Sequence, residues 1–243
     1  MISIKNTTDS CPISSCTIRA MKQKRGVPLT RLNQLSSQLG RKDEAPNIEL
    51  AEQLVKYEDL EGINEVIQNL HNPDKKIQQD CMKVVYEIGK RNPHLIQHET
   101  ETFLSFLKSR NNRMVWGAMT ALSTVTPLSS SLMMNHLRTI FTAIQTGSVI
   151  TVDKGIFTLA TLASVNESNN RKIFPFLLNH LETCRPKEVP QHAESTMRAV
   201  TEENVTAFLT VLKKREPYLT PPQLKRIKRI YKTFETKDGK EEG

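Results

Sequence analysis

The pentapeptide VIQNL at residues 66–70 begins a pattern of apolar residues that returns three times, each time 37 residues further along the chain. It returns as FLSFL at 103–107, IFTAI at 140–144 and LLNHL at 177–181. The first, second and fifth residues of all four segments are apolar, which places them on one face of an α-helix. An internal repeat of this length predicts a stacked array of similar supersecondary units.

A second set of apolar residues follows each segment at nearly the same interval. Its first residue is always small, which lets neighbouring helices approach closely. The four sets are Cys81, Val85, Ile88; Ala118, Leu122, Val125; Gly155, Leu159, Leu162; and Ala193, Met197, Val200. The two sets therefore predict that each unit consists of an outer helix A and an inner helix B. These helices can bury their apolar faces only when successive units stack on one another. Val85, Leu122, Leu159 and Met197 are expected to form one continuous buried row.

Turn and capping residues lie between the predicted helices. Asn72-Pro73-Asp74 separates helix A from helix B in the first unit, and Asp74 is a predicted N-cap. Ser129-Ser130 is expected to cap helix A of the third unit. Thr220-Pro221-Pro222-Gln223 combines an N-cap threonine, a proline at the first helical position and a capping-box glutamine.

The repeat predicts an all-α fold, a right-handed αα-superhelix of about five helical hairpins between residues 58 and 234. One further helix near 47–57 precedes the first unit. It lacks a clear partner, so we expect it to cap the array with help from Leu32 and Leu35. The predicted domains are a basic, mostly disordered leader (1–45), the solenoid (46–236) and a disordered tail (237–243). Within the leader, tertiary contacts are expected only for Val27–Leu39.

Charge is distributed unevenly along the chain, whose net charge is +8. Residues 1–42 and residues 205–232 each contain 8 basic side chains and 1 acidic side chain. The segment between them, residues 43–204, contains 16 basic and 20 acidic side chains. Blocks of one sign occur both in interaction tails and in solvated capping surfaces. The leader also has the composition of an organelle transit peptide, and Met21 is an alternative start codon.

The composition favours an intracellular, cytoplasmic protein. The four cysteines form no disulfide framework and no zinc-binding spacing, which fits a reducing compartment. The mean hydropathy is −0.44, and no secretory signal or membrane-spanning segment is evident. We expect no membrane partner.

The helical hairpins of about 37 residues, with their two apolar sets and the Asn72-Pro73-Asp74 turn, resemble HEAT-type or armadillo-like repeats. The resemblance covers roughly residues 58–234. It implies a non-enzymatic scaffold that holds a protein or peptide partner on an extended concave face.

Similar HEAT-like repeats also form bacterial alkylpurine DNA glycosylases, in which concave tryptophans act with an aspartate and an arginine. This chain has a single tryptophan, Trp116, with Asp153 in register beside it, and no paired aromatic cleft. Nucleic-acid binding through the basic ends is therefore the alternative function, with or without base-excision chemistry.

The B helices are expected to line the concave face. The residues that point away from the apolar row on three successive B helices are Gln79, Lys83, Trp116, Thr120, Asp153 and Phe157. Trp116 and Phe157 are interpreted either as anchors for a partner or as rings packed between units. Residues 114–170 contain only four charged side chains, whereas 25% of all residues in the chain are charged. A surface with so little charge suits either an interface or a Ser/Thr-rich solvated surface.

The last predicted helix has a basic patch, read either as a phosphate-binding surface or as the polar outer face of a terminal repeat. Its residues are Lys225, Arg226, Lys228, Arg229 and Lys232. His94 and His98 have i, i+4 spacing but lack a third ligand, so we expect no metal site there. Phosphate-binding and nucleophile motifs are absent from the sequence, so neither a cofactor nor a small-molecule substrate is expected.

Overall fold

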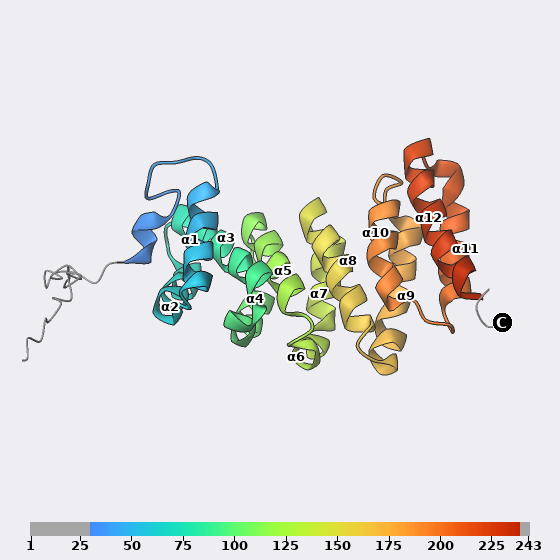
Figure 1. The fold of residues 1–243 in the computed structure, drawn as a ribbon, viewed down its shortest axis with the longest axis horizontal. Coiled ribbons are helices and arrows are strands. Elements are labelled where there is room, and N and C mark those ends of the chain that lie inside the picture. The colour runs from blue at the N-terminus through green and yellow to red at the C-terminus, as the bar shows by residue number, and fades with distance from the viewer. Residues whose placement is uncertain (1–29, 239–243) are drawn as a thin grey trace, which may run out of the picture.

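The computed structural model describes residues 30–238, which form an elongated array of helical hairpins (Figure 1). All regular elements within these residues are helical. The α-helices are α1 (Ala45–Lys56), α2 (Leu60–Gln68), α3 (Lys75–Arg91), α4 (Thr100–Phe106), α5 (Asn112–Val125), α6 (Ser130–Asn135), α7 (Leu137–Thr146), α8 (Val149–Ala163), α9 (Glu167–Thr183), α10 (Val189–Thr196), α11 (Val205–Arg215) and α12 (Pro221–Asp238). No helix in this range is both long enough and apolar enough to cross a bilayer.

The five predicted units correspond to the hairpins α2/α3, α4/α5, α7/α8, α9/α10 and α11/α12. The B helices α3, α5, α8, α10 and α12 each pack against the next B helix and form the inner row. Helix α1 packs along α3 and begins this row, so it caps the array as predicted, with Leu35 buried and Leu32 packed against the core. The fold is thus the predicted αα-superhelix, extended by one inner helix.

The packed part of the chain begins earlier than the predicted boundary at residue 46. Leu35, after the 3₁₀ turn Arg31–Gln34, is fully buried. The Ser36 backbone N–H donates to Asn47 Oδ1 at 2.9 Å, and the Ser37 N–H donates to Asp80 Oδ2 at 2.8 Å. Residues 30–44 therefore belong to the solenoid. Residues 1–29 and 239–243, which hold most of the predicted leader and tail, lie outside the described residues.

The buried inner row is confirmed at three of its four predicted positions. Val85, Leu122 and Leu159 are fully buried, whereas Met197 is only partly buried. The difference arises because α10 ends at Thr196 and continues as a 3₁₀ turn, Met197–Ala199. The tighter turn changes the angular step between residues, so Thr196 and Ala199 occupy the buried positions instead.

The small residue at the start of each apolar set is needed most clearly at Gly155. A Cβ atom at this position would lie 2.3 Å from Ile144 Cγ1, inside the α7/α8 hairpin. Any larger side chain would therefore force the two helices of this unit apart.

Two of the predicted caps are present. Asp74 Oδ1 accepts from the Lys76 N–H at 2.8 Å, and Gln223 Oε1 accepts from the Thr220 N–H at 2.8 Å. Ser129 lies at the N-cap position of α6, but its side chain caps nothing; its hydroxyl accepts from Thr100 Oγ1 at 2.9 Å. Helix A of the third unit is also divided at His136 into α6 and α7.

Candidate partner-binding face

The structure places the six predicted inner-face residues in different environments. Lys83 and Thr120 are only 8% and 4% exposed, so the prediction that they contact a partner was wrong. Thr120 Oγ1 donates to the Trp116 carbonyl at 2.8 Å, which satisfies its hydroxyl within α5. Gln79, Trp116, Asp153 and Phe157 are half-buried.

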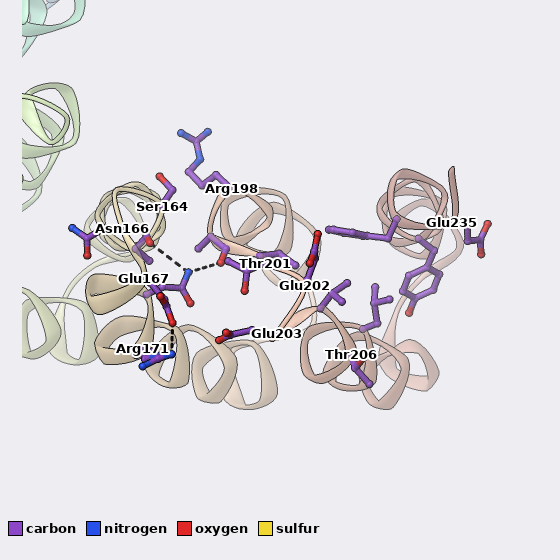
Figure 2. A pocket seen from close by; sticks show the side chains of 18 of the residues that line it. Ser164, Asn166, Glu167, Arg171, Arg198, Thr201, Glu202, Glu203, Thr206 and Glu235 are labelled. Atoms are coloured by element: carbon purple, nitrogen blue, oxygen red, sulfur yellow. Dashed lines mark hydrogen bonds and ion pairs between the residues drawn. The ribbon is translucent and has the colours of Figure 1, made fainter. Parts of the chain in front are cut away.

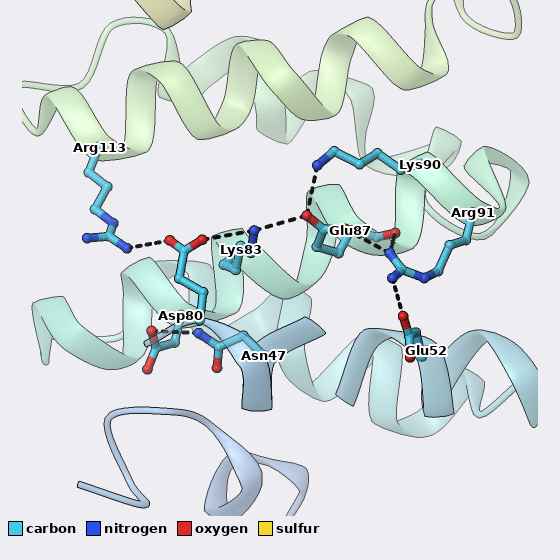
Figure 3. Close-up of polar contacts among 9 residues, drawn as sticks. Asn47, Glu52, Asp80, Lys83, Glu87, Lys90, Arg91 and Arg113 are labelled. Carbon is cyan, nitrogen blue, oxygen red and sulfur yellow. Dashed lines mark hydrogen bonds and ion pairs between the residues drawn. The ribbon is translucent and has the colours of Figure 1, made fainter. Parts of the chain in front are cut away.

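Lys83 is buried because it belongs to a network of ion pairs that joins α1, α3 and α5 (Figure 3). Its Nζ lies 2.9 Å from Glu44 Oε2 and 3.0 Å from Glu87 Oε1. Glu87 also accepts from Lys90 Nζ at 2.8 Å and from Arg91 Nη1 at 2.8 Å. Two peripheral ion pairs extend the network on either side. Arg113 Nη2 lies 3.0 Å from Glu44 Oε1, and Arg91 Nη2 lies 2.6 Å from Glu52 Oε1.

The network changes the ionisation of its buried members. Burial alone would raise the pKa of Glu87, but hydrogen bonds from Lys90, Arg91 and Lys83 outweigh burial and lower its pKa from 4.5 to about 2. Burial acts to lower the pKa of Lys83, but hydrogen bonds to Glu44, Tyr86 and Glu87 raise it above its ordinary value. Both groups are therefore charged at neutral pH.

Acid should destabilise the solenoid through Glu87. Its folded-state pKa is depressed, so the stability it contributes is fully present above pH 4.5 and is lost as the pH falls from 4.5 towards about 2. We expect the free energy of unfolding of the wild type and of Glu87→Gln to converge across this window. Urea titrations at successive pH values measure it, and a difference that stays constant with pH would contradict the assignment.

Trp116 and Phe157 form partly exposed aromatic positions on successive B helices, each beside a guanidinium group. The Trp116 ring centroid lies 5.8 Å from that of Tyr86, and the Arg113 guanidinium carbon lies 6.0 Å from the Trp116 ring. The Arg198 guanidinium carbon lies 4.1 Å from the Phe157 ring. Each ring thus packs against its neighbours and keeps part of its surface accessible. The contacts support the packing interpretation, and the role of the rings as anchors stays a prediction.

Asp153 is engaged inside the solenoid and is not a free carboxylate on the inner face. Its Oδ1 lies 2.8 Å from Nε2 of His192, which is fully buried in α10. His192 Nδ1 lies 2.9 Å from Nε2 of His180 in α9. Sequence reasoning missed both histidines, although His180 and Cys184 have i, i+4 spacing and His192 directly precedes Ala193 of the fourth apolar set.

The basic patch lies on the exposed side of the terminal helix α12. Ile227 and Ile230 are buried and hold the helix against the array, while Lys225, Lys228, Arg229 and Lys232 are exposed. Arg226 Nη2 pairs with Glu194 of α10 at 2.7 Å. The geometry is that of a terminal helix with a polar outer face.

A cleft of about 1030 Å³ between the fourth and fifth units was not predicted (Figure 2). It is lined by the segment that follows the 3₁₀ turn Met197–Ala199, by α11 and by the C-terminal part of α12. Tyr231 and Phe234 form an apolar wall, and the opposite side contains the ion pair Glu167–Arg171 and the polar loop around Thr201. Asn170 Nδ2 supports the loop by donating to the Ala199 carbonyl at 2.7 Å.

His94 and His98 do not share one face of an α-helix. They lie in separate 3₁₀ turns, Pro93–Leu95 and Gln97–Glu99, and both are exposed. The i, i+4 pairing considered from their spacing is therefore absent.

Comparison with known proteins places this geometry in a fold class. Superposition on an engineered protein gives a TM-score of 0.60 at 14% identity, covering 84% of this chain and 96% of the other. A designed armadillo repeat protein in complex with the peptide (KR)4 gives a TM-score of 0.56 at 13% identity. This superposition covers 84% of this chain and 99% of the designed protein. This chain has the HEAT/armadillo αα-repeat fold.

The same HEAT/armadillo fold matches part of a larger protein, a karyopherin. The karyopherin Kap121p bound to the SUMO protease Ulp1p gives a TM-score of 0.58 at 16% identity, over 82% of this chain. The chain spans only 22% of the length of Kap121p. No protein-family model and no curated protein sequence matches this HEAT/armadillo-like chain.

Proposed function

We propose that this chain is a non-enzymatic HEAT/armadillo-like scaffold that binds an extended peptide, or one helix, of a protein partner along its inner face. The observation that carries the proposal is the pair of half-exposed aromatic rings, Trp116 and Phe157, on successive B helices. Packed helices lie about 8–10 Å apart, so the rings offer regularly spaced contacts to a partner that follows the row.

The surroundings of the two rings support a binding surface. Between residues 114 and 170 the chain has four charged side chains, and charge depletion is typical of the centre of an interface. Arg113 and Arg198 lie at the rings, and Arg198 is exposed. A partner segment with an apolar side chain beside carboxylates complements this combination of aromatic and cationic groups.

The solved structures with the same fold agree with a scaffold. The designed armadillo repeat protein holds a (KR)4 peptide, and Kap121p holds Ulp1p in one structure and Pho4p in another. The exposed Arg198 guanidinium at Phe157 favours a partner of the opposite charge from (KR)4, so we expect acidic and apolar sequences to bind here.

Replacing Trp116 with alanine should weaken peptide binding about tenfold or more, because truncating an aromatic anchor at the centre of an interface typically costs over 1–2 kcal/mol. Peptides selected from a random display library on the wild type provide the ligands, and fluorescence polarisation measures their affinity. Phe157→Ala is the second test variant, and circular dichroism checks that each variant is folded.

Two controls separate this surface from the rest of the molecule. Tyr218→Ala removes an aromatic that is 68% exposed and lies outside the inner row, so it should leave peptide affinity unchanged. Lys228→Glu with Arg229→Glu reverses charge on α12 and should also leave it unchanged. Folded Trp116 and Phe157 variants that both bind like the wild type would refute the site. Salt-sensitive binding of nucleic acid that is lost only in the α12 variant would favour the alternative function.

A further inference from the structure

Three side chains with metal-binding atoms converge where α9 and α10 meet. His180 is in α9, Cys184 is the C-cap residue directly after α9, and His192 is in α10. One nitrogen of each imidazole and the Cys184 Sγ all lie within 4.8 Å of one another. The two facing nitrogens, His180 Nε2 and His192 Nδ1, are 2.9 Å apart, and the ring planes are tilted by 52°. The three donor atoms thus lie around a common centre, close enough together for one ion to contact all three.

Asp153 determines which nitrogen of His192 faces that centre. Its carboxylate Oδ1 lies 2.8 Å from His192 Nε2, so this nitrogen donates a proton to the carboxylate. His192 Nδ1 then keeps its lone pair and faces His180 and Cys184. A carboxylate that holds the remote N–H of a histidine is the usual support for a metal-ligating imidazole. His192 is fully buried, so its orientation is fixed by packing as well.

The cluster is reachable from outside the protein. A cleft of about 640 Å³ between the α7–α8 and α9–α10 turns is lined by His180 and Cys184, together with Glu188 and Val152. An ion can therefore enter, and a water molecule can occupy a fourth coordination position from the cleft side.

We propose that His180, Cys184 and His192 bind a divalent late first-row transition metal ion, such as Zn²⁺, with Asp153 as the positioning residue for His192. Two imidazole nitrogens and one thiolate form a borderline-soft ligand set, which suits zinc and its neighbours and disfavours magnesium and calcium. On binding, the Cys184 thiol releases its proton to solvent and the sulfur becomes the ligand. The proposal is independent of the peptide-binding function.

The bound ion would connect the two helices of the fourth unit and reinforce the junction of this unit with the third. Asp153 belongs to α8. The ligands lie in α9, at its C-cap and in α10, which is only 8 residues long. The metal would therefore cross-link the fourth unit and hold it against the third through the Asp153–His192 contact.

Zinc competition against a chromogenic chelator tests the proposal on the full chain. Cys11→Ser and Cys16→Ser are introduced first as a common background, because thiols elsewhere in the chain also bind zinc. We expect this background protein to bind about one Zn²⁺ per chain, and His180→Ala or Cys184→Ser to lower the affinity at least about tenfold. His94→Ala with His98→Ala removes two exposed histidines as the matched control and should change nothing.

Cobalt substitution distinguishes ligands from the positioning residue. We expect Co²⁺ to give the visible bands of a tetrahedral site and a thiolate charge-transfer band in the near ultraviolet. Cys184→Ser should abolish the charge-transfer band. Asp153→Asn should keep that band while weakening affinity about 10–100-fold, since it alters only the support of a ligand.

The competing explanation is a hydrogen-bonded chain in which His180 donates to His192 and His192 donates to Asp153, without a metal. It predicts no zinc binding and no rise in melting temperature when zinc is added. Either result with the folded background protein overturns the proposal, as does zinc affinity that survives both His180→Ala and Cys184→Ser. Circular dichroism of each variant confirms that lost affinity does not reflect unfolding.

Discussion

Leu122→Ala should lower the free energy of unfolding by roughly 2–5 kcal/mol, the range for truncating a leucine in a packed core. Leu122 is fully buried in α5, between the equally buried Val85 of α3 and Leu159 of α8. The truncation would leave a cavity at the centre of the inner row, where helices on both sides are fixed by their own neighbours and cannot collapse into it.

Leu128→Ala is the matched control for this variant. Leu128 follows α5 closely and is 38% exposed, so its truncation should change stability by no more than about 0.5 kcal/mol. Urea unfolding of both variants measures the difference. A lower midpoint with an unchanged m-value indicates loss of stability in one cooperative array, whereas a changed m-value indicates that units unfold separately. Equal midpoints for the two variants would show that the inner row is wrongly assigned.

Glu87→Ala should cost about 3 kcal/mol or more, because three cations converge on a carboxylate that is only 8% exposed at its side chain. Its loss leaves the buried Lys83 ammonium with Glu44 as its remaining carboxylate, while Arg91 keeps its ion pair with Glu52. Removing one member of a buried ionic network leaves uncompensated charge in a region that water reaches poorly.

Two further variants test the explanation. Glu52 also pairs with Arg91, but its side chain is 57% exposed, so Glu52→Ala should cost less than about 1 kcal/mol. The double variant Lys83→Met with Glu87→Met removes both buried charges and should recover part of the stability that Glu87→Ala loses. If Glu87→Ala and Glu52→Ala have the same thermal stability, the network contributes no more than a surface ion pair.

The candidate binding face was only partly predictable from the sequence. The fixed angular step between successive residues of an α-helix correctly predicted that Trp116 and Phe157 point away from the apolar row. This step follows from helix geometry alone. It also placed Lys83 and Thr120 there, and both are buried. The burial of Lys83 depends on Glu44, 39 residues earlier in the chain, and Glu44 reaches it only because α1 joins the inner row.

The residue pattern alone predicts the repeat of about 37 residues, the alternation of outer and inner helices, and the small residues where those helices approach closely. These features are determined locally, because a helix has a fixed period and each apolar face requires a neighbour. The packing of residues 30–44 on the array and the convergence of three cations on Glu87 follow from how the helices stack. The same stacking brings His180, Cys184 and His192 together with Asp153. Such contacts join residues on separate helices, and their distances are determined by the way those helices stack.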